Sequence, residues 1–138
     1  MRNLDLAFDY LKRARVRLAA LDVLYEGQSW ADVVRESQEI VELTLKALLR
    51  ASGVDAPRIH DVAPILRSER ARLPESLAPF IDELAEASRQ LRRDRELAFY
   101  GAEDLTPGDF YTRIDADHAR AAARRVAELV TQHVPELS

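Results

Sequence analysis

The stretch RRDRELAFYG, residues 92–101, holds the side chains best suited to chemistry in this sequence. It places Arg92, Arg93 and Arg95 within four positions and follows them with Phe99 and Tyr100. A guanidinium group keeps its charge at every physiological pH, and its planar fork matches the oxygens of a phosphate. The net charge of −4 argues against a protein that coats nucleic acid through its overall charge. A phosphate site must therefore be a local patch, and this stretch is the candidate.

The same arginines also have a purely structural interpretation. Positive charge near the C-terminal end of a helix complements the helix dipole, and Glu96 has the spacing of an ion-pair partner for Arg92 or Arg93. Arg95 lies beside the apolar stripe of its helix, where an unpaired charge costs free energy, so it needs a carboxylate partner or a functional cleft. Tyr100 has the alternative of packing with its hydroxyl at the rim of the core. Both interpretations stay open at this point.

The remaining residues that could do chemistry do not combine into a site. His60 precedes Asp61, where it either lines a nucleotide pocket or belongs to a helix-capping loop, and the loop is the favoured interpretation. His118 and His133 lack the spacing of metal ligands. The chain has no cysteine, and its four scattered glycines form no phosphate-cradling loop. We therefore expect neither a metal nor a cofactor.

Apolar residues recur every three or four positions along most of the chain, which is typical of amphipathic helices. No segment shows the sustained alternation of a strand. The spacing predicts long helices from Leu4 to Tyr25, from about Trp30 to Gly53, from Leu77 to Gly101 and from Asp115 to Pro135. A short helix is expected after Asp61. The predicted fold is all-α, an antiparallel bundle of four long helices with a short connecting helix.

Several residues are expected to end these helices or to fill the core. Ser29 and Asp32 have the spacing of a capping box, Gly53 suits a left-handed cap, and Asp61, Ser76 and Asp115 are candidate N-caps. Glu42 and Lys46 fit an ion pair four residues apart. The core positions predicted from the stripes are Leu11, Leu18, Val41, Leu45, Leu84, Leu91, Val126 and Leu129.

The composition indicates one globular domain over residues 1–138. Apolar residues make up 47% of the chain and charged residues 32%, and no apolar run approaches the roughly 18 residues of a membrane span. The first residues interleave charged and apolar side chains, unlike a signal peptide. Together with the absence of cysteine, this leads us to expect a cytoplasmic protein with no membrane contact.

One long stretch resembles a known family. ESQEIVELTLKALLRASGVDAPRIHDVAPIL, residues 36–66, is similar to the characteristic part of the HEPN domain, the higher-eukaryote and prokaryote nucleotide-binding family. In both, a helix ends in a lysine-alanine-leucine-leucine theme, a glycine and a short loop follow, and His-Asp opens the next helix. The order of helices agrees over nearly the whole chain. RRDRELAFYG then occupies the place where that family keeps its functional motif.

The resemblance implies a homodimeric protein, often the toxin of a toxin–antitoxin pair whose partner is a minimal nucleotidyltransferase. Many members of the family are metal-independent ribonucleases with an arginine, four to six intervening residues and a histidine. Here Tyr100 follows Arg95 after four intervening residues, and the next two positions are Gly101 and Ala102, so no histidine stands at the motif spacing. Tyrosine is a poor base, because its pKa near 10 leaves about a thousandth of it ionised at neutral pH. By analogy with some family members, Tyr100 is also a candidate acceptor of AMP from the partner enzyme.

Two hypotheses about function remain from the sequence. In the first, the protein is a toxin-like HEPN protein that acts on RNA, with Arg95 and Tyr100 as candidate catalytic residues. In the second, it is a non-catalytic dimeric module that binds nucleotide or a partner protein and has lost the ribonuclease histidine. In both, Arg92, Arg93 and Arg95 are the candidate residues for binding RNA or nucleotide.

Overall fold

The structure is a computed structural model that describes residues 2–55, 62–100 and 110–137. Within these ranges only the backbone is described for residues 2, 3, 93–100 and 136. The described residues contain helices and no strand, so the all-α prediction is confirmed. The α-helices are α1 (Arg2–Glu26), α2 (Trp30–Ala51), α3 (Ala63–Ser68), α4 (Ile81–Tyr100) and α6 (Arg113–His133), with 3-10 turns at Arg70–Arg72, Glu75–Phe80 and Pro135–Leu137.

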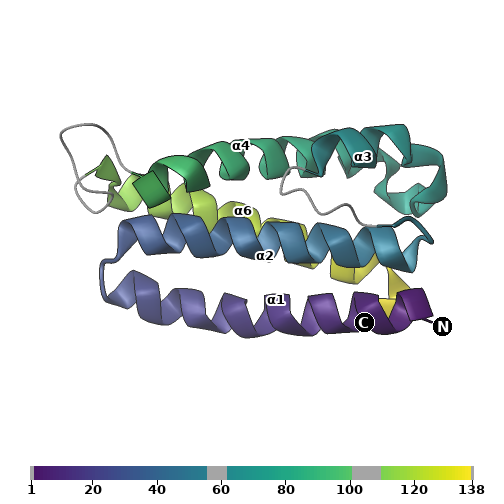
Figure 1. Cartoon of the computed structure of the whole chain (residues 1–138), viewed down its shortest axis with the longest axis horizontal. Helices are drawn as coiled ribbons and strands as arrows, with labels where there is room; N and C mark the ends of the chain where they lie inside the picture. Colours follow the sequence, from purple (N-terminus) through teal and green to yellow (C-terminus); the bar gives the residue numbers. More distant parts are fainter. Residues whose placement is uncertain (1, 56–61, 101–109, 138) are drawn as a thin grey trace.

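Helix α2 is the centre of the bundle. It packs along α1, α4 and α6, whereas α1 and α4 each make few contacts with α6. Figure 1 shows α1 and α4 on opposite sides of α2, with α6 behind it. The sequence of α2 suits this place, because its apolar residues cover more than one face and most of its side chains are buried.

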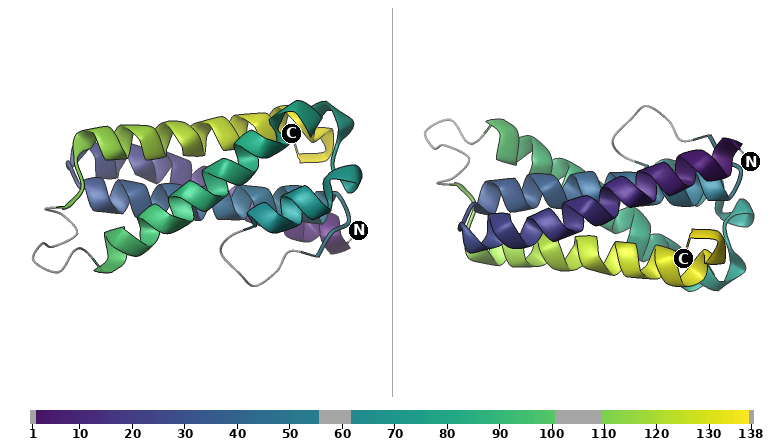
Figure 2. Two further views of the ribbon diagram at one scale, coloured as in Figure 1. Left: turned by 90° about the horizontal axis from the view of Figure 1, so that it is seen from above. Right: turned by 90° about the horizontal axis from the view of Figure 1, so that it is seen from below.

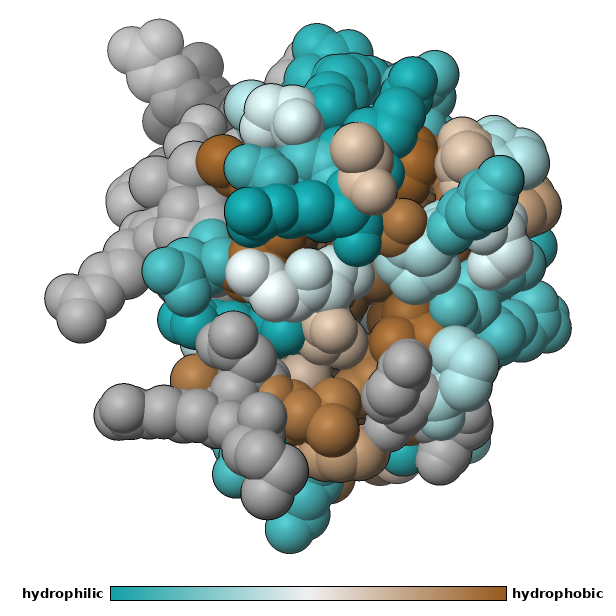
Figure 3. All heavy atoms as spheres, turned by 90° about the vertical axis from the view of Figure 1, so that its right-hand side faces the viewer, coloured by the Kyte–Doolittle hydropathy of each residue, from teal (hydrophilic) through white to brown (hydrophobic). Residues whose placement is uncertain are grey.

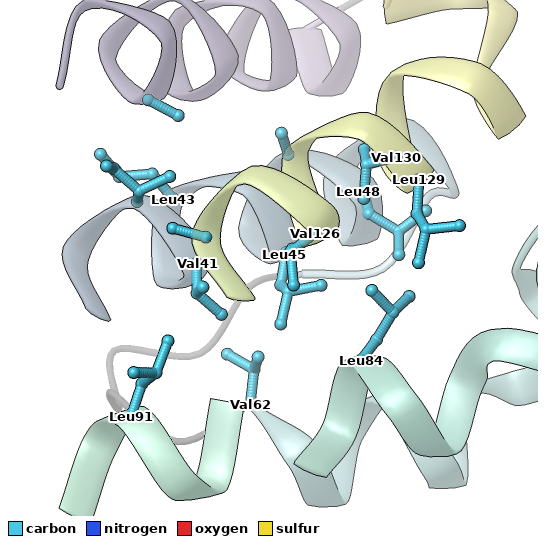
Figure 4. Packing of buried hydrophobic residues seen from close by; sticks show 14 of the residues in the cluster. Val41, Leu43, Leu45, Leu48, Val62, Leu84, Leu91, Val126, Leu129 and Val130 are labelled. Atoms are coloured by element: carbon cyan, nitrogen blue, oxygen red, sulfur yellow. The ribbon is translucent and has the colours of Figure 1, made fainter. Parts of the chain in front are cut away.

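Leucines and valines from α2, α4 and α6 meet in the core. Figure 4 shows Val41 and Leu45 of α2 beside Leu84 and Leu91 of α4 and Val126 of α6. Seven of the eight predicted core residues are buried. The exception is Leu18, which is only partly buried. It lines a groove of about 300 Å³ between α1 and α6, two helices that touch only sparsely.

Some of the helix caps predicted from the sequence are present in the structure, and others are not. Gly53 has a φ of +78°, and the Val54 N–H donates to the Leu49 carbonyl at 2.8 Å, which is the expected left-handed cap of α2. The capping box predicted at Ser29 is wrong. The Ser29 hydroxyl donates to the Asp32 carboxylate at 2.6 Å and caps no backbone N–H.

Other predicted helix starts also shift by a few residues. The N-cap of α6 is Thr112, and Asp115 completes its capping box from the third helical position by accepting from the Thr112 N–H. The α-helical part of α4 begins at Ile81 and not at Leu77, because a 3-10 segment containing Pro79 precedes it. Ser76 bonds to His133 instead of capping a helix. Asp61 lies outside the described residues, and the N-cap of α3 is Val62.

The two ends of the bundle differ in what they bring together. At one end lie the C-terminal end of α4, the start of α6 and the turn between α1 and α2 (Figure 1). The chain termini lie at the other end, whose described surface is mainly hydrophilic with apolar residues between the polar ones (Figure 3). Within the described ranges, no helix combines the length and the apolar character that crossing a membrane requires.

Candidate functional site

The predicted motif forms the last part of α4. The backbone is helical through Tyr100, so the three arginines lie within about one turn in the C-terminal half of this helix. Arg92 is partly buried. The side chains of Arg93, Arg95 and Tyr100 lie outside the described residues, as does Gly101. A shared arginine cleft therefore stays a prediction.

A groove between α4 and α6 leads to the motif. Its volume is about 360 Å³, and it is open to solvent along one side. Small and apolar side chains form its floor, and polar or charged side chains form its rim. The floor consists of Ala87, Leu91, Ala119, Ala122 and Val126, and the rim of Glu83, Glu86, Gln90, His118 and Arg125.

The groove exists because α4 diverges from α6. In the left view of Figure 2, α4 crosses α2 obliquely and moves away from α6 toward its own C-terminal end. The alanines on both helices leave the gap unfilled. At its narrow end, the Arg125 guanidinium donates to the Glu83 carboxylate at 2.9 Å, and this hydrogen bond raises the pKa of Arg125. The two helices are farthest apart at the C-terminal end of α4, which carries the motif.

The rim of the groove carries groups of both charges. The Arg89 guanidinium donates to the Glu86 carboxylate at 3.0 Å, which holds the pKa of Glu86 below its ordinary value. Both carboxylates of the rim thus have an arginine partner. His118 is exposed on α6, and it shares the groove with Leu91, the residue that precedes Arg92.

Helix α2 carries a buried row of polar side chains. Gln38, Glu42 and Lys46 follow one another at intervals of four residues, so they lie on one side of the helix. The Lys46 ammonium donates to the Glu42 carboxylate at 2.8 Å, which confirms the pair expected from the sequence, and the Gln38 amide donates to it at 3.3 Å. Only 7% of the Glu42 side chain is exposed. A carboxylate this deep requires such partners.

Helix α4 also holds the segment that follows His60 and Asp61. The Val62 N–H donates to the Ser88 hydroxyl at 3.2 Å, in a buried position one helical turn before Arg92. His60 and Asp61 themselves lie outside the described residues. The family-like stretch therefore ends against the helix that carries the motif.

A basic cluster that the sequence did not reveal lies between α1 and α6. The Arg113 guanidinium donates to the Tyr25 hydroxyl at 3.0 Å, and the Arg120 guanidinium lies 3.7 Å from the centre of the Tyr25 ring. Arg124 pairs with Asp22 at 2.9 Å. The three arginines are seven and four residues apart, a spacing that places them on one face of a helix and can be read from the sequence. Their partners on α1 could not be predicted, because they lie about 90 or more positions away in the chain. These contacts join the two helices, and we assign them a structural role.

Comparison with known proteins agrees with these features. A protein-family model described as the HEPN domain matches residues 7–134, nearly the whole chain. No curated protein and no solved structure is similar enough to give a match. Across the described side chains, no group of three or more histidines and carboxylates is placed to hold a metal ion.

Proposed function

The chain belongs to the HEPN family, and from that premise we propose that it is a homodimer that binds RNA or nucleotide through the arginines at the end of α4. The observation that carries the proposal is the groove between α4 and α6, which is lined by Leu91, the residue that precedes Arg92. Its volume of about 360 Å³ falls within the range of roughly 300–1,000 Å³ that is usual for ligand sites. An apolar floor suits the faces of a nucleobase, and adjacent guanidinium groups suit its phosphate.

In the proposed dimer, the two copies of α4 meet near their C-terminal ends. Arg95 and Tyr100 of each chain then line one shared basic cleft, with Arg92 and Arg93 at its mouth. Each guanidinium that contacts a phosphate contributes about 1.5–3 kcal/mol through charge-assisted hydrogen bonds before dehydration is counted. Light scattering at tens of micromolar tests the dimer, and a monomer at that concentration contradicts it.

The binding site is tested by titrating the parent and an Arg95→Ala variant with short RNA and with ATP, at two salt concentrations. We expect Arg95→Ala to weaken binding about tenfold or more, which corresponds to about 1.4 kcal/mol. Loss of phosphate contacts also reduces the dependence of affinity on salt. Arg72→Ala is the matched control, because it removes the same charge from an exposed position in the 3-10 turn Arg70–Arg72, outside α4 and α6.

Two results contradict the proposed site. In one, the parent binds neither RNA nor ATP. In the other, Arg95→Ala binds like the parent, so that the arginines are a solvated helix end.

We further propose that the protein is toxin-like and is controlled by a nucleotidyltransferase that transfers AMP to Tyr100. An anionic adduct there is favoured by the neighbouring arginines and fills the cleft. A nucleotidyltransferase reading frame beside this one supports the pairing. If that enzyme and ATP adenylylate the parent and a Tyr100→Phe variant equally, Tyr100 is not the acceptor.

The missing motif histidine favours a second candidate function, a dimeric module that binds nucleotide or a partner and does not cleave RNA. The two candidates differ in one measurement. Purified protein that binds RNA and leaves it intact supports the second candidate, and cleavage supports the first.

A further inference from the structure

The two histidines with described side chains occupy contrasting environments. His133 Nδ1 is hydrogen-bonded to the Ser76 hydroxyl at 2.9 Å, and its ring lies 5.5 Å from that of Phe80. It joins the end of α6 to the start of the α4 region. His118 is exposed in the groove, and none of the described residues forms a hydrogen bond with it. Its imidazole is exposed to solvent.

The register of α4 against α6 places His118 near the motif. Arg125 contacts Glu83, and the two helices run in opposite directions from that contact. Counting seven residues from that contact along each helix, a distance of about 10 Å at 1.5 Å per residue, leads to Gln90 on α4 and to His118 on α6. These two residues therefore lie at the same level along the two helices. Arg92 follows two residues later. Arg95 lies about 7 Å farther along the axis of α4 than Gln90.

We propose that His118 is the proton-transfer residue of this site and replaces the histidine that the motif lacks. The inference rests on the proposed RNA site and adds cleavage to it. A phosphate bound at Arg92, which follows Leu91 of the groove floor, has its ribose close to the groove that His118 lines. The imidazole is the side chain whose ordinary pKa lies closest to neutrality, so it exchanges protons readily there.

The step that His118 performs is the opening of an RNA phosphodiester. The neutral imidazole takes the proton of the ribose 2′-hydroxyl, and the 2′-oxygen attacks phosphorus. The bond from phosphorus to the 5′-oxygen breaks, and that oxygen takes a proton from water. The products are a 2′,3′-cyclic phosphate and a 5′-hydroxyl, with no change in oxidation state and no metal required.

The other charged groups that face the groove are less suited than His118 to transfer a proton. On α4, Glu83 is engaged by Arg125 and Glu86 by Arg89. On α6, Arg125 is the remaining charged group of the rim, and a guanidinium does not lose its proton near neutral pH. Tyr100 is the alternative proton carrier, and a Tyr100→Phe variant separates the two.

The test is cleavage of a labelled single-stranded RNA of mixed sequence in the presence of EDTA, with binding measured in parallel. We expect His118→Gln to slow cleavage by about 100-fold or more while RNA affinity changes by less than about threefold. His133→Gln is the matched control and cleaves at close to the parent rate. Added imidazole restores cleavage to a His118→Gly variant, which a purely structural role would not allow.

The outcomes separate this inference from the proposed function. Parent protein that binds RNA but leaves it intact overturns the role of His118 and leaves the binding site standing. Cleavage that is unchanged in His118→Gln, or that is lost in Tyr100→Phe and kept in His118→Gln, also overturns it. If the parent does not bind RNA at all, the proposed function fails together with this inference.

Discussion

The ion pair between Glu42 and Lys46 gives a prediction with a calculable size. Both side chains are mostly buried, with 7% and 14% exposed, and their charged atoms lie 2.8 Å apart. Removing one member of a fully buried pair costs about 3–5 kcal/mol, because the other charge is left in a poorly solvated place. Lys46→Met leaves Glu42 with the Gln38 amide at 3.3 Å, which offsets part of that cost. We expect a loss of about 2–3 kcal/mol.

The assay is equilibrium unfolding in urea at pH 7, with thermal unfolding as a second measurement. A loss of this size lowers Tm by about 8 °C in a domain of this length. The double variant Glu42→Gln with Lys46→Met carries no unpaired charge, so it should cost at least about 1.5 kcal/mol less than the sum of the two single changes. Arg72→Met is the control, since its pair with Glu69 is exposed, and it should change stability by less than about 0.5 kcal/mol.

Two results would refute this reasoning. If Lys46→Met changes the free energy of unfolding by less than about 0.5 kcal/mol, water reaches Glu42 and the pair is effectively a surface pair. If the single costs add up to the cost of the double variant, the two charges do not interact across their short distance, and the burial of the row has another cause.

Two further predictions concern the core and the rim of the groove. Leu84→Ala, at a fully buried position between α2 and α6, should lower the free energy of unfolding by about 3 kcal/mol, whereas Val16→Ala at a position 65% exposed should change it by less than about 0.5 kcal/mol, both measured by urea unfolding. Arg89→Gln should raise the pKa of Glu86 toward its ordinary value, as followed by NMR titration of the carboxyl. Because the folded pKa of Glu86 is depressed, its contribution to stability is present above the unfolded pKa and is lost as the pH falls through the folded pKa, and the variant should lack this acid-side loss. If the pKa of Glu86 is the same in the variant, Arg89 is not what lowers it.

Features set by neighbours along the chain were predictable from the sequence. Helix periodicity identified the bundle and seven of its core residues, because one face of each helix must leave water. Gly53 was predictable as a left-handed cap, and Glu42 with Lys46 as a pair, since both depend on residues within about one turn. The motif and its missing histidine could also be read directly from residues 92–101.

Features set by the placement of whole helices were decided only by the tertiary structure. Leu18 repeats the stripe of α1 but is only partly buried, because α1 and α6 lie too far apart to cover it. His118 has no signal in its own neighbourhood, and its place in the groove follows from the divergence of α4 from α6. Local patterns fix which face of a helix is apolar. The crossing angle and register of two helices depend on side chains that interlock across the interface, and those contacts join residues far apart in the chain.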